Sequence, residues 1–243
     1  MTAPHALILT APGTNRDRDV AEALEQAGAT ATRVALHQLK DPVAHLRSAQ
    51  LVVLAGGFSH GDALGAGAVW ASDVSTHLAD ELRSFVADGK AVIGICNGFQ
   101  TLVRTGLLPG SLAHNAPGPF VCKWVTIEPT EVRCIWTEGL HHKVHCPVAH
   151  GEGRYIADEA TILRHGALQY ADETNPNGSL GDVAGATDTT GRILGLMPHP
   201  ENHIFPSQHP RHHRTARYTT PVQQSLHLGL ALFAAGVRHA RRV

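Results

Sequence analysis

Short apolar runs that alternate with segments of helical period are the feature that most limits how this chain can fold. The predicted strands are residues 6–10, 30–36, 51–55 and 90–95, and the predicted helices between them are 17–27, 42–48 and 73–87. Strands that are apolar almost throughout are buried on both faces, as they are in a parallel sheet covered by helices. We therefore expect an α/β fold with a doubly wound, open and mostly parallel sheet flanked by helices. Such sheets place their sites at the carboxyl ends of the strands.

The pattern changes after a further predicted helix at 101–108. Predicted strands then follow with little helix between them, at residues 120–127, 131–136, 143–148, 168–171, 183–187 and 193–197. We expect a short helix at 158–166, a turn at 175–178 and a last helix at 221–238. This part of the chain predicts a β-rich addition to the parallel core. No repeat and no linker is visible, so we expect one domain over residues 1–243.

Cys96 ends the apolar run 92–95, with Gly94 before it and Gly98 after it. The pattern Gly-x-Cys-x-Gly between a strand and a helix is typical of a nucleophile elbow, in which a sharp turn raises the nucleophile above the sheet. Amides at the start of the following helix favour a thiolate at this place. The alternative is a buried structural cysteine, because free cysteine is among the residues most often buried. A histidine base elsewhere in the chain is needed to favour catalysis.

A base and its orienting carboxylate are both present in Pro-His-Pro-Glu at 198–201, directly after the predicted strand 193–197. A residue before proline is biased toward an extended backbone, so His199 and Glu201 can point the same way. Glu201 can then bind one imidazole nitrogen and leave the other for Cys96. The alternative is a surface loop with an incidental histidine, since the chain contains 18 histidines.

Acyl chemistry also needs backbone amides that bind the oxyanion. The amide of Asn97 directly follows the nucleophile, and Gly57 lies just beyond the predicted strand 51–55 at the same edge of the sheet. A plain Gly-Gly turn at 56–57 is the alternative. Gln100 lies one helical turn beyond Cys96, where its amide can hold the substrate or can simply cap or pack the helix.

Composition excludes several classes of function. The net charge is −1 with histidine neutral, which argues against nucleic acid and against an anionic membrane as partners. No apolar run approaches the roughly 20 residues of a membrane span, and residues 1–16 lack the pattern of a signal peptide. The four cysteines form no Cys-x-x-Cys pair. We therefore expect no structural metal and a reducing, cytoplasmic location.

Five sequence blocks together resemble one enzyme family. They are Gly-Gly-Phe-Ser-His-Gly-Asp at 56–62, Gly-Ile-Cys-Asn-Gly-Phe-Gln at 94–100, Ala-His-Gly-Glu-Gly-Arg-Tyr at 149–155, Asn-Pro-Asn-Gly-Ser at 175–179 and Gly-Leu-Met-Pro-His-Pro-Glu at 195–201. The second and fifth blocks resemble the class I glutamine amidotransferases. The third and fourth narrow the resemblance to the glutaminase subunit, subunit I, of phosphoribosylformylglycinamidine synthase.

The resemblance implies a flavodoxin-like fold, glutamine as substrate and a catalytic triad of Cys96, His199 and Glu201. It implies a step of de novo purine biosynthesis in which glutamine is hydrolysed to glutamate and ammonia through a cysteine thioester. It also implies that the ammonia passes to a large ATP-dependent synthetase subunit, and that a small third subunit joins the complex. No Gly-x-x-x-x-Gly-Lys-Ser/Thr loop is present. ATP and Mg²⁺ are therefore expected on the partner, with no cofactor on this chain.

Some residues depart from this family pattern or have no clear role. His60 stands where the family more often has tyrosine. Residues 203–217 are longer and more basic than the family suggests; we interpret them as a solvated loop, with a partner-docking segment or an adventitious metal site as alternatives. His150 and Arg154 can line the pocket or face a partner, and we assign neither to the triad. His150 is otherwise typical of a structural histidine.

Two other functions remain open at this stage. The first is the glutaminase subunit of another amidotransferase, or a cysteine hydrolase on the same fold, because a different substrate changes the pocket walls and leaves the triad intact. The second is an inactive regulatory or binding module. The complete set of Cys96, His199 and Glu201 argues against that second alternative.

Overall fold

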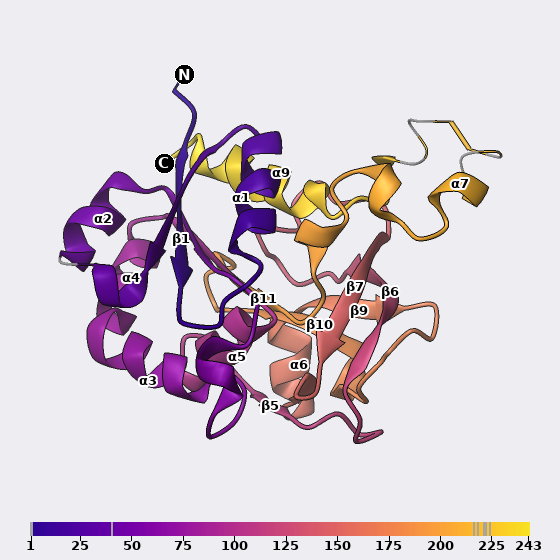
Figure 1. Ribbon diagram of the computed structural model, residues 1–243, viewed down its shortest axis with the longest axis horizontal. Coiled ribbons are helices and arrows are strands. Elements are labelled where there is room, and N and C mark those ends of the chain that lie inside the picture. The colour runs from indigo at the N-terminus through magenta and orange to yellow at the C-terminus, as the bar shows by residue number, and fades with distance from the viewer. Residues whose placement is uncertain (1, 40, 216, 218, 221–222, 224) are drawn as a thin grey trace.

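The computed structural model describes residues 2–39, 41–215, 217, 219–220, 223 and 225–243. The strands of its main sheet are β1 (His5–Thr10), β2 (Thr30–Ala35), β3 (Leu51–Leu54), β4 (Ala91–Ile95), β6 (Val121–Pro129), β7 (Val144–His150), β9 (Gly166–Ala171), β10 (Val183–Thr187) and β11 (Ile193–Leu196). Their spatial order is β2-β1-β3-β4-β11-β10-β9-β6-β7 (Figure 1). A second, smaller sheet pairs β5 (Ser111–Ala113) with β8 (Arg154–Ile156).

The main sheet has a parallel half and an antiparallel half. Pairing is parallel from β2 to β11 and antiparallel from β11 to β7. The predicted doubly wound α/β architecture is confirmed, and the predicted β-rich addition continues the same sheet. The two halves differ in burial, as their sequences suggest. Every residue of β3 and β4 is buried, whereas buried and partly exposed residues alternate along β7.

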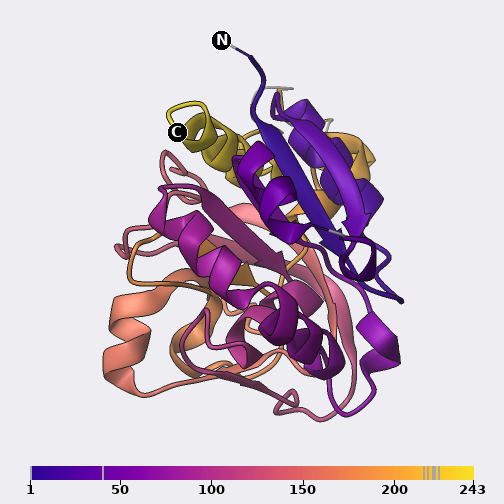
Figure 2. The same ribbon diagram turned by 90° about the vertical axis from the view of Figure 1, so that its left-hand side faces the viewer.

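Helices cover both faces of the parallel half, as Figure 2 shows. They are α1 (Asp17–Gln26), α2 (Pro42–Ser48), α3 (Ala68–His77), α4 (Ala79–Ala87), α5 (Asn97–Arg104) and α9 (Leu230–Ala240). Helix α6 (Glu159–His165) packs on β9 and β10 of the antiparallel half, and α7 (His212–Thr215) packs on the segment 206–208. Helices α1 and α9 lie side by side, although they come from opposite ends of the chain (Figure 1). Helix α5 follows β4 and packs on β4, β11 and α3, which fixes the turn between β4 and α5 in the core. None of the described helices is both long and apolar enough to cross a bilayer.

Two helix predictions were wrong in extent. The single helix expected at 73–87 is two helices, because the backbone of Leu78 leaves the helical region (φ −147°, ψ −13°) where this side chain is buried. The helix expected at 101–108 begins at Asn97, directly after Cys96. Asparagine and glycine have low propensities for a helix interior, and the first turn of α5 contains both, with Gly98 packed closely on Leu54.

Two further predictions fail because of long-range packing. Residues 131–136 form turns rather than a strand. Their apolar character is explained by Trp136, which is fully buried against Gly236 of α9 and donates a hydrogen bond from Nε1 to the backbone oxygen of Arg192 (3.1 Å). The last helix, expected at 221–238, is interrupted: Gln223 and Ser225 are helical, residues 226–229 are not, and α9 begins at Leu230. Residues 221, 222 and 224 of that prediction lie outside the described residues.

Candidate active site

The backbone at Cys96 forms a strained turn between β4 and α5. Its dihedral angles, φ 51° and ψ −103°, lie where residues with a side chain are rarely found. The turn leaves no room for a side chain at either of the flanking glycines, Gly94 and Gly98. A Cβ on Gly94 would lie 2.7 Å from the backbone of Gly98, and a Cβ on Gly98 would lie 2.0 Å from the backbone oxygen of Leu54. The Gly-x-Cys-x-Gly pattern therefore has the geometry expected of a nucleophile elbow.

His199 reaches the same edge of the sheet because β11 runs parallel to β4. Leu196 pairs with Ile95, and its backbone oxygen accepts a hydrogen bond from the amide of Cys96 (2.8 Å). His199 Nδ1 lies 2.7 Å from Glu201 Oε1, and both side chains are buried. The backbone conformation differs from the predicted one, because Glu201 lies in the 3-10 helix η4 (Pro200–Asn202) and not in an extended segment. The two side chains nevertheless meet as predicted.

The environment of His199 favours its protonated form. Burial opposes a charge on the ring, but Glu201 and Cys96, which both interact with it, outweigh burial and raise the pKa of His199 to about 10. A protonated ring between a thiol and a carboxylate can deliver its proton to a leaving group. The second oxygen of the carboxylate, Glu201 Oε2, is buried and has no hydrogen-bond partner within the described residues.

A cavity of about 150 Å³ opens beside the sulfur of Cys96. It is lined by Gly57, Phe58, Asp62, Ala66, Cys96, Gln100, His114, Phe120, Ala149, His150, Gly151 and Glu152. Phe58 and Phe120, both exposed, lie at its rim with ring centroids 6.2 Å apart. The cavity is narrow and holds two carboxylates, of which burial raises the pKa of Asp62. Its size and charge suit a small polar molecule with a positive group.

Gly57, which lines this cavity, and Asn97, which directly follows Cys96, each present an unused backbone amide. Gly57 forms an antiparallel bridge with Thr14. The ladder hydrogen bonds, Phe58 N to Gly13 O and Asn15 N to Gly56 O, flank this bridge and leave the amide of Gly57 outside the ladder. Asn97 is the first residue of α5, so its amide has no helical acceptor. Neither amide has a partner among the residues that the structure describes, so both are available as the predicted oxyanion donors.

Gln100 lines the cavity, but its side-chain amide is already engaged. Its Oε1 accepts a hydrogen bond from Asn97 Nδ2 (3.0 Å), and its Nε2 donates to the backbone oxygen of Glu152 (2.6 Å). Gln100 therefore joins the elbow to the loop after β7. Its predicted contact with substrate stays a prediction. The second lone pair of Oε1 and the second N–H of Nε2 are the groups that can make it.

The structure separates the residues whose roles the sequence left open. His150 lines the cavity, whereas Arg154 Nε donates to the backbone oxygen of Gly178 (3.1 Å). Asn177 Nδ2 donates to the backbone oxygen of Gly153 (2.8 Å), so the fourth sequence block holds the third in place. His60 lies outside the cavity lining, with Nε2 3.4 Å from Asp73 Oδ2.

Sequence reasoning assigned no role to several cavity residues. Asp62 and Glu152 lie within the first and third blocks, so their positions in those blocks were the available signal. Glu152 accepts hydrogen bonds from the amide of Ala66 (3.3 Å) and lies 3.5 Å from the guanidinium of Arg104. His114 and Phe120 lie outside every block, and no local pattern points to them.

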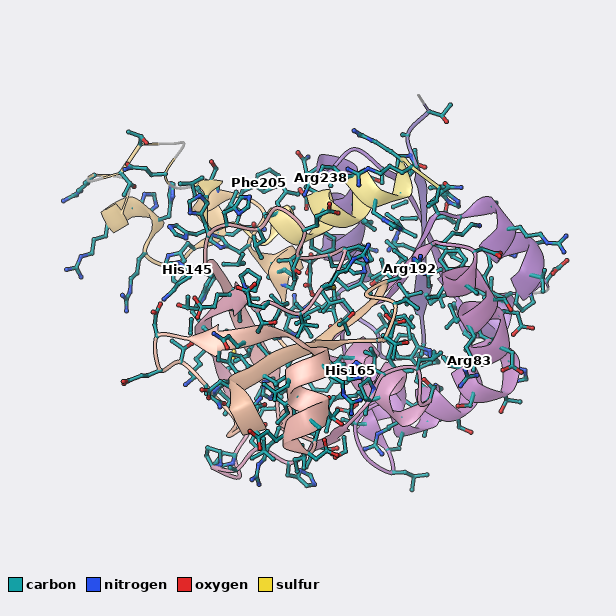
Figure 3. All side chains as sticks on the ribbon, turned by 180° about the vertical axis from the view of Figure 1, so that it is seen from behind. Arg83, His145, His165, Arg192, Phe205 and Arg238 are labelled. Carbon is teal, nitrogen blue, oxygen red and sulfur yellow. The ribbon has the colours of Figure 1, made fainter. Side chains whose placement is uncertain are left out.

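The basic segment 203–217 borders a second and larger cavity of about 860 Å³, near the end of β7 that carries His145 (Figure 3). Residue 216 lies outside the described residues. Trp124, His145, His203, His209 and His227 are among the lining side chains, and none of the cavity's lining residues is shared with the cavity at Cys96. In the described part of the chain, no group of three or more His, Cys, Asp or Glu side chains is arranged to hold a metal ion. The adventitious metal site therefore finds no support there.

Comparison with known proteins agrees with this geometry. The CobB/CobQ-like glutamine amidotransferase domain matches residues 3–239. A phosphoribosylformylglycinamidine synthase subunit PurQ of Treponema denticola is 44% identical over 239 residues, which covers 83% of this chain and 88% of that protein. The corresponding subunit of Dehalococcoides mccartyi is 36% identical over 263 residues and covers both chains completely.

A solved structure is similar to this chain in three dimensions as well. A chain of the PurLQS structure from Thermotoga maritima is 33% identical, with a TM-score of 0.74, and the match covers 93% of this chain and 98% of that one. A glutamine amidotransferase from the same organism, at 15% identity and a TM-score of 0.62, shows the shared fold. The chain belongs to the CobB/CobQ-like glutamine amidotransferase family and, within it, to the PurQ subunits of phosphoribosylformylglycinamidine synthase.

Proposed function

We propose that this chain is the glutaminase subunit of phosphoribosylformylglycinamidine synthase in de novo purine biosynthesis, and that it hydrolyses glutamine to glutamate and ammonia. Residues 1–243 act in this proposal as one glutamine amidotransferase domain. The observation that carries it is the meeting of three groups at one edge of the sheet, where Cys96 lines the cavity. Cys96 lies on a strained elbow, and the hydrogen-bonded pair of His199 and Glu201 follows the neighbouring strand. We assign glutamine as the substrate because the chain belongs to this family.

In the first half of the reaction, Cys96 Sγ, as the thiolate paired with protonated His199, attacks the side-chain carboxamide carbon of glutamine. The amides of Gly57 and Asn97 bind the oxyanion that forms. Protonated His199 gives its proton to the amide nitrogen as the carbon–nitrogen bond breaks, and ammonia leaves. The γ-glutamyl group remains on sulfur as a thioester.

In the second half, water attacks the thioester carbon. His199, now neutral, accepts a proton from this water, and the same two amides bind the second oxyanion. The carbon–sulfur bond breaks, glutamate leaves, and Cys96 and His199 return to their starting state. Glu201 holds the ring of His199 in orientation throughout. Gln100 contacts the substrate through its oxygen in this proposal.

The wider assembly is also part of the proposal. Ammonia passes to a large synthetase subunit that uses ATP and Mg²⁺, and a small third subunit completes the complex, so no cofactor is assigned to this chain. The name PurLQS of the Thermotoga maritima structure supports this arrangement. The four unpaired cysteines suit a reducing cytoplasm. Nucleic acid and membrane are not among the proposed partners.

The test is a glutaminase assay on the purified chain, alone and with the large and small subunits of the complex. We expect glutamate release that increases on assembly, and conversion of formylglycinamide ribonucleotide with glutamine as nitrogen source. Glutamate release that never responds to the partner would count against this acceptor and favour another amidotransferase. The variant Cys96→Ala serves as control, since it must lose the glutamine-dependent reaction while the complex keeps its ammonia-dependent reaction.

A further inference from the structure

His150, the last residue of β7, carries a ring nitrogen that the proposed reaction leaves unused. The side chain is 2% exposed, and Nε2 is buried without a hydrogen-bond partner in the described part of the chain. The residue also lines the 150 Å³ cavity beside Cys96. A buried polar atom without a partner destabilises a fold, so its presence beside a catalytic cavity calls for an explanation.

Asn115 determines which nitrogen of His150 carries the proton. Its Nδ2 donates to the backbone oxygens of His150 (2.9 Å) and Pro119 (3.2 Å), and its Oδ1 accepts from the amide of Gly153 (3.1 Å). These partners fix the orientation of the Asn115 amide. His150 Nδ1 lies 3.0 Å from Oδ1, which can only accept, so Nδ1 must donate. In the neutral ring, Nε2 is therefore left with a lone pair and no proton.

The ring of His150 is also fixed in place and kept neutral. A Cβ on Gly153 would lie 2.4 Å from Nδ1 and Cε1 of the ring, so only glycine lets the ring occupy this position. The side chain of Asn177 donates a hydrogen bond to the backbone oxygen of Gly153 and so fixes that glycine in place. Burial, together with the nearby His199, lowers the pKa of His150 to about 4, so the ring carries no charge near neutral pH. The cavity is thus bordered by a rigid, neutral ring that carries an unused hydrogen-bond acceptor.

We propose that His150 Nε2 accepts a hydrogen bond from the side-chain –NH₂ of bound glutamine and so selects a carboxamide over a carboxylate. This inference rests on the proposed glutaminase function. A carboxamide has one oxygen for the amides of Gly57 and Asn97 and two N–H donors, one of which satisfies Nε2. A carboxylate has no N–H, and its negative oxygen is repelled by the lone pair. The same contact that orients the substrate therefore weakens the binding of glutamate.

Two isosteric variants separate the two ring nitrogens. His150→Asn keeps a polar group near the position of Nδ1, next to Asn115, and loses the acceptor at Nε2. His150→Gln places an amide oxygen near the position of Nε2. The measurements are kcat and KM for glutamine and the inhibition constant of glutamate, on the assembled complex. Alkylation of Cys96 by iodoacetamide, together with thermal unfolding, checks that the elbow is intact.

We expect His150→Asn to raise the KM for glutamine at least tenfold while the inhibition constant of glutamate stays the same or falls, and His150→Gln to recover part of the loss. An equal rise of both constants, or no change in either, overturns the proposal. Should both variants misfold, ¹⁵N imidazole spectra of the Cys96→Ala chain give the answer: glutamine must shift the Nε2 resonance of His150, and glutamate must not. Wild-type chain that releases no glutamate at all instead contradicts the glutaminase function.

Discussion

The side chain of Asn97 binds the backbone of Ser59: Oδ1 accepts a hydrogen bond from the Ser59 amide at 3.1 Å, across 38 positions of sequence. Its Nδ2 donates to Asp62 Oδ1 and to Gln100 Oε1, both at 3.0 Å. The loop that carries Gly57 is thereby tied to the turn that carries Cys96. One side chain thus fixes the spacing between the two amides that we assign to the oxyanion.

Replacing Asn97 by aspartate tests this link. In Asn97→Asp the carboxylate still accepts from Ser59, but it has no proton for Asp62 or Gln100 and it faces the charge of Asp62. We expect kcat/KM for glutamine to fall on the order of 10²-fold, as when an oxyanion donor is misplaced. The double variant with Asp62→Asn removes the repulsion and is expected to regain part of the activity. Full activity of Asn97→Asp alone contradicts this account.

Strain at Cys96 predicts that activity and stability conflict at this residue. A residue with a side chain at φ 51° and ψ −103° costs of order 1–3 kcal/mol, which glycine avoids. Cys96→Gly and Cys96→Ala both remove the nucleophile, so both lose glutamine hydrolysis. In urea unfolding, the glycine variant is expected to be more stable than the alanine variant by about 1 kcal/mol. Cys122→Ser, at an exposed cysteine, serves as the matched control and keeps activity.

Glu201→Gln tests the origin of the raised pKa of His199. The carboxylate raises that pKa toward about 10, so stability gained from the charged ring is complete below pH 6.5 and is lost as the pH rises through the folded value. The variant is expected to lose this alkaline dependence in thermal unfolding, and to lose about 10²–10⁴-fold in kcat because the ring is no longer oriented. If the thermal stability of Glu201→Gln still falls with rising alkaline pH as in the wild type, another group titrates there.

At acid pH the dependence of stability on pH has the opposite sign. Burial lowers the pKa of His150 and of His203 to about 4, so both bind protons more readily in the unfolded chain. Stability is expected to fall as the pH drops from 6.5 toward 4, as measured by the urea midpoint. His203→Asn should make this decline shallower. His77→Asn, at an exposed histidine, should leave it unchanged.

The elbow glycines give a prediction about packing alone. In Gly98→Ala the new Cβ would lie 2.0 Å from the backbone oxygen of Leu54, and a backbone atom cannot swing aside. We expect a loss of about 3 kcal/mol or more in the free energy of unfolding. Gly151→Ala is the control, because its Cβ would meet nothing closer than a ring carbon of Phe120 at 3.8 Å. Equal losses in both variants would show that close packing is not the cause.

The sequence was sufficient where a local pattern reports a local cause. Apolar runs predicted the buried strands, and Gly94 and Gly98 predicted the turn at Cys96 because both glycines are needed for that turn. Pro-His-Pro-Glu predicted the pair His199 and Glu201, although the backbone that joins them is a 3-10 helix. Each of these features is set within a few residues, so it can be read without the fold.

What the sequence left out depends on contacts between distant segments. Trp136 looked like part of a strand because its burial against α9 leaves no local trace. The lone pair of His150 Nε2 follows from Asn115, 35 residues away, and from Gly153. His114 and Phe120 reach the cavity only through the fold of the loops around β6 and β7. Cavity walls of this kind are built by topology, and spacing along the chain does not reveal them.

The parallel pairing of β4 with β11 also sets when the enzyme can first work during its synthesis. Cys96 emerges from the ribosome about a hundred residues before His199, and the strand that brings the histidine alongside is the last to join the sheet. Domains form as units once their distant parts are available. A nascent or prematurely terminated chain therefore carries its thiol without base or carboxylate and consumes no glutamine.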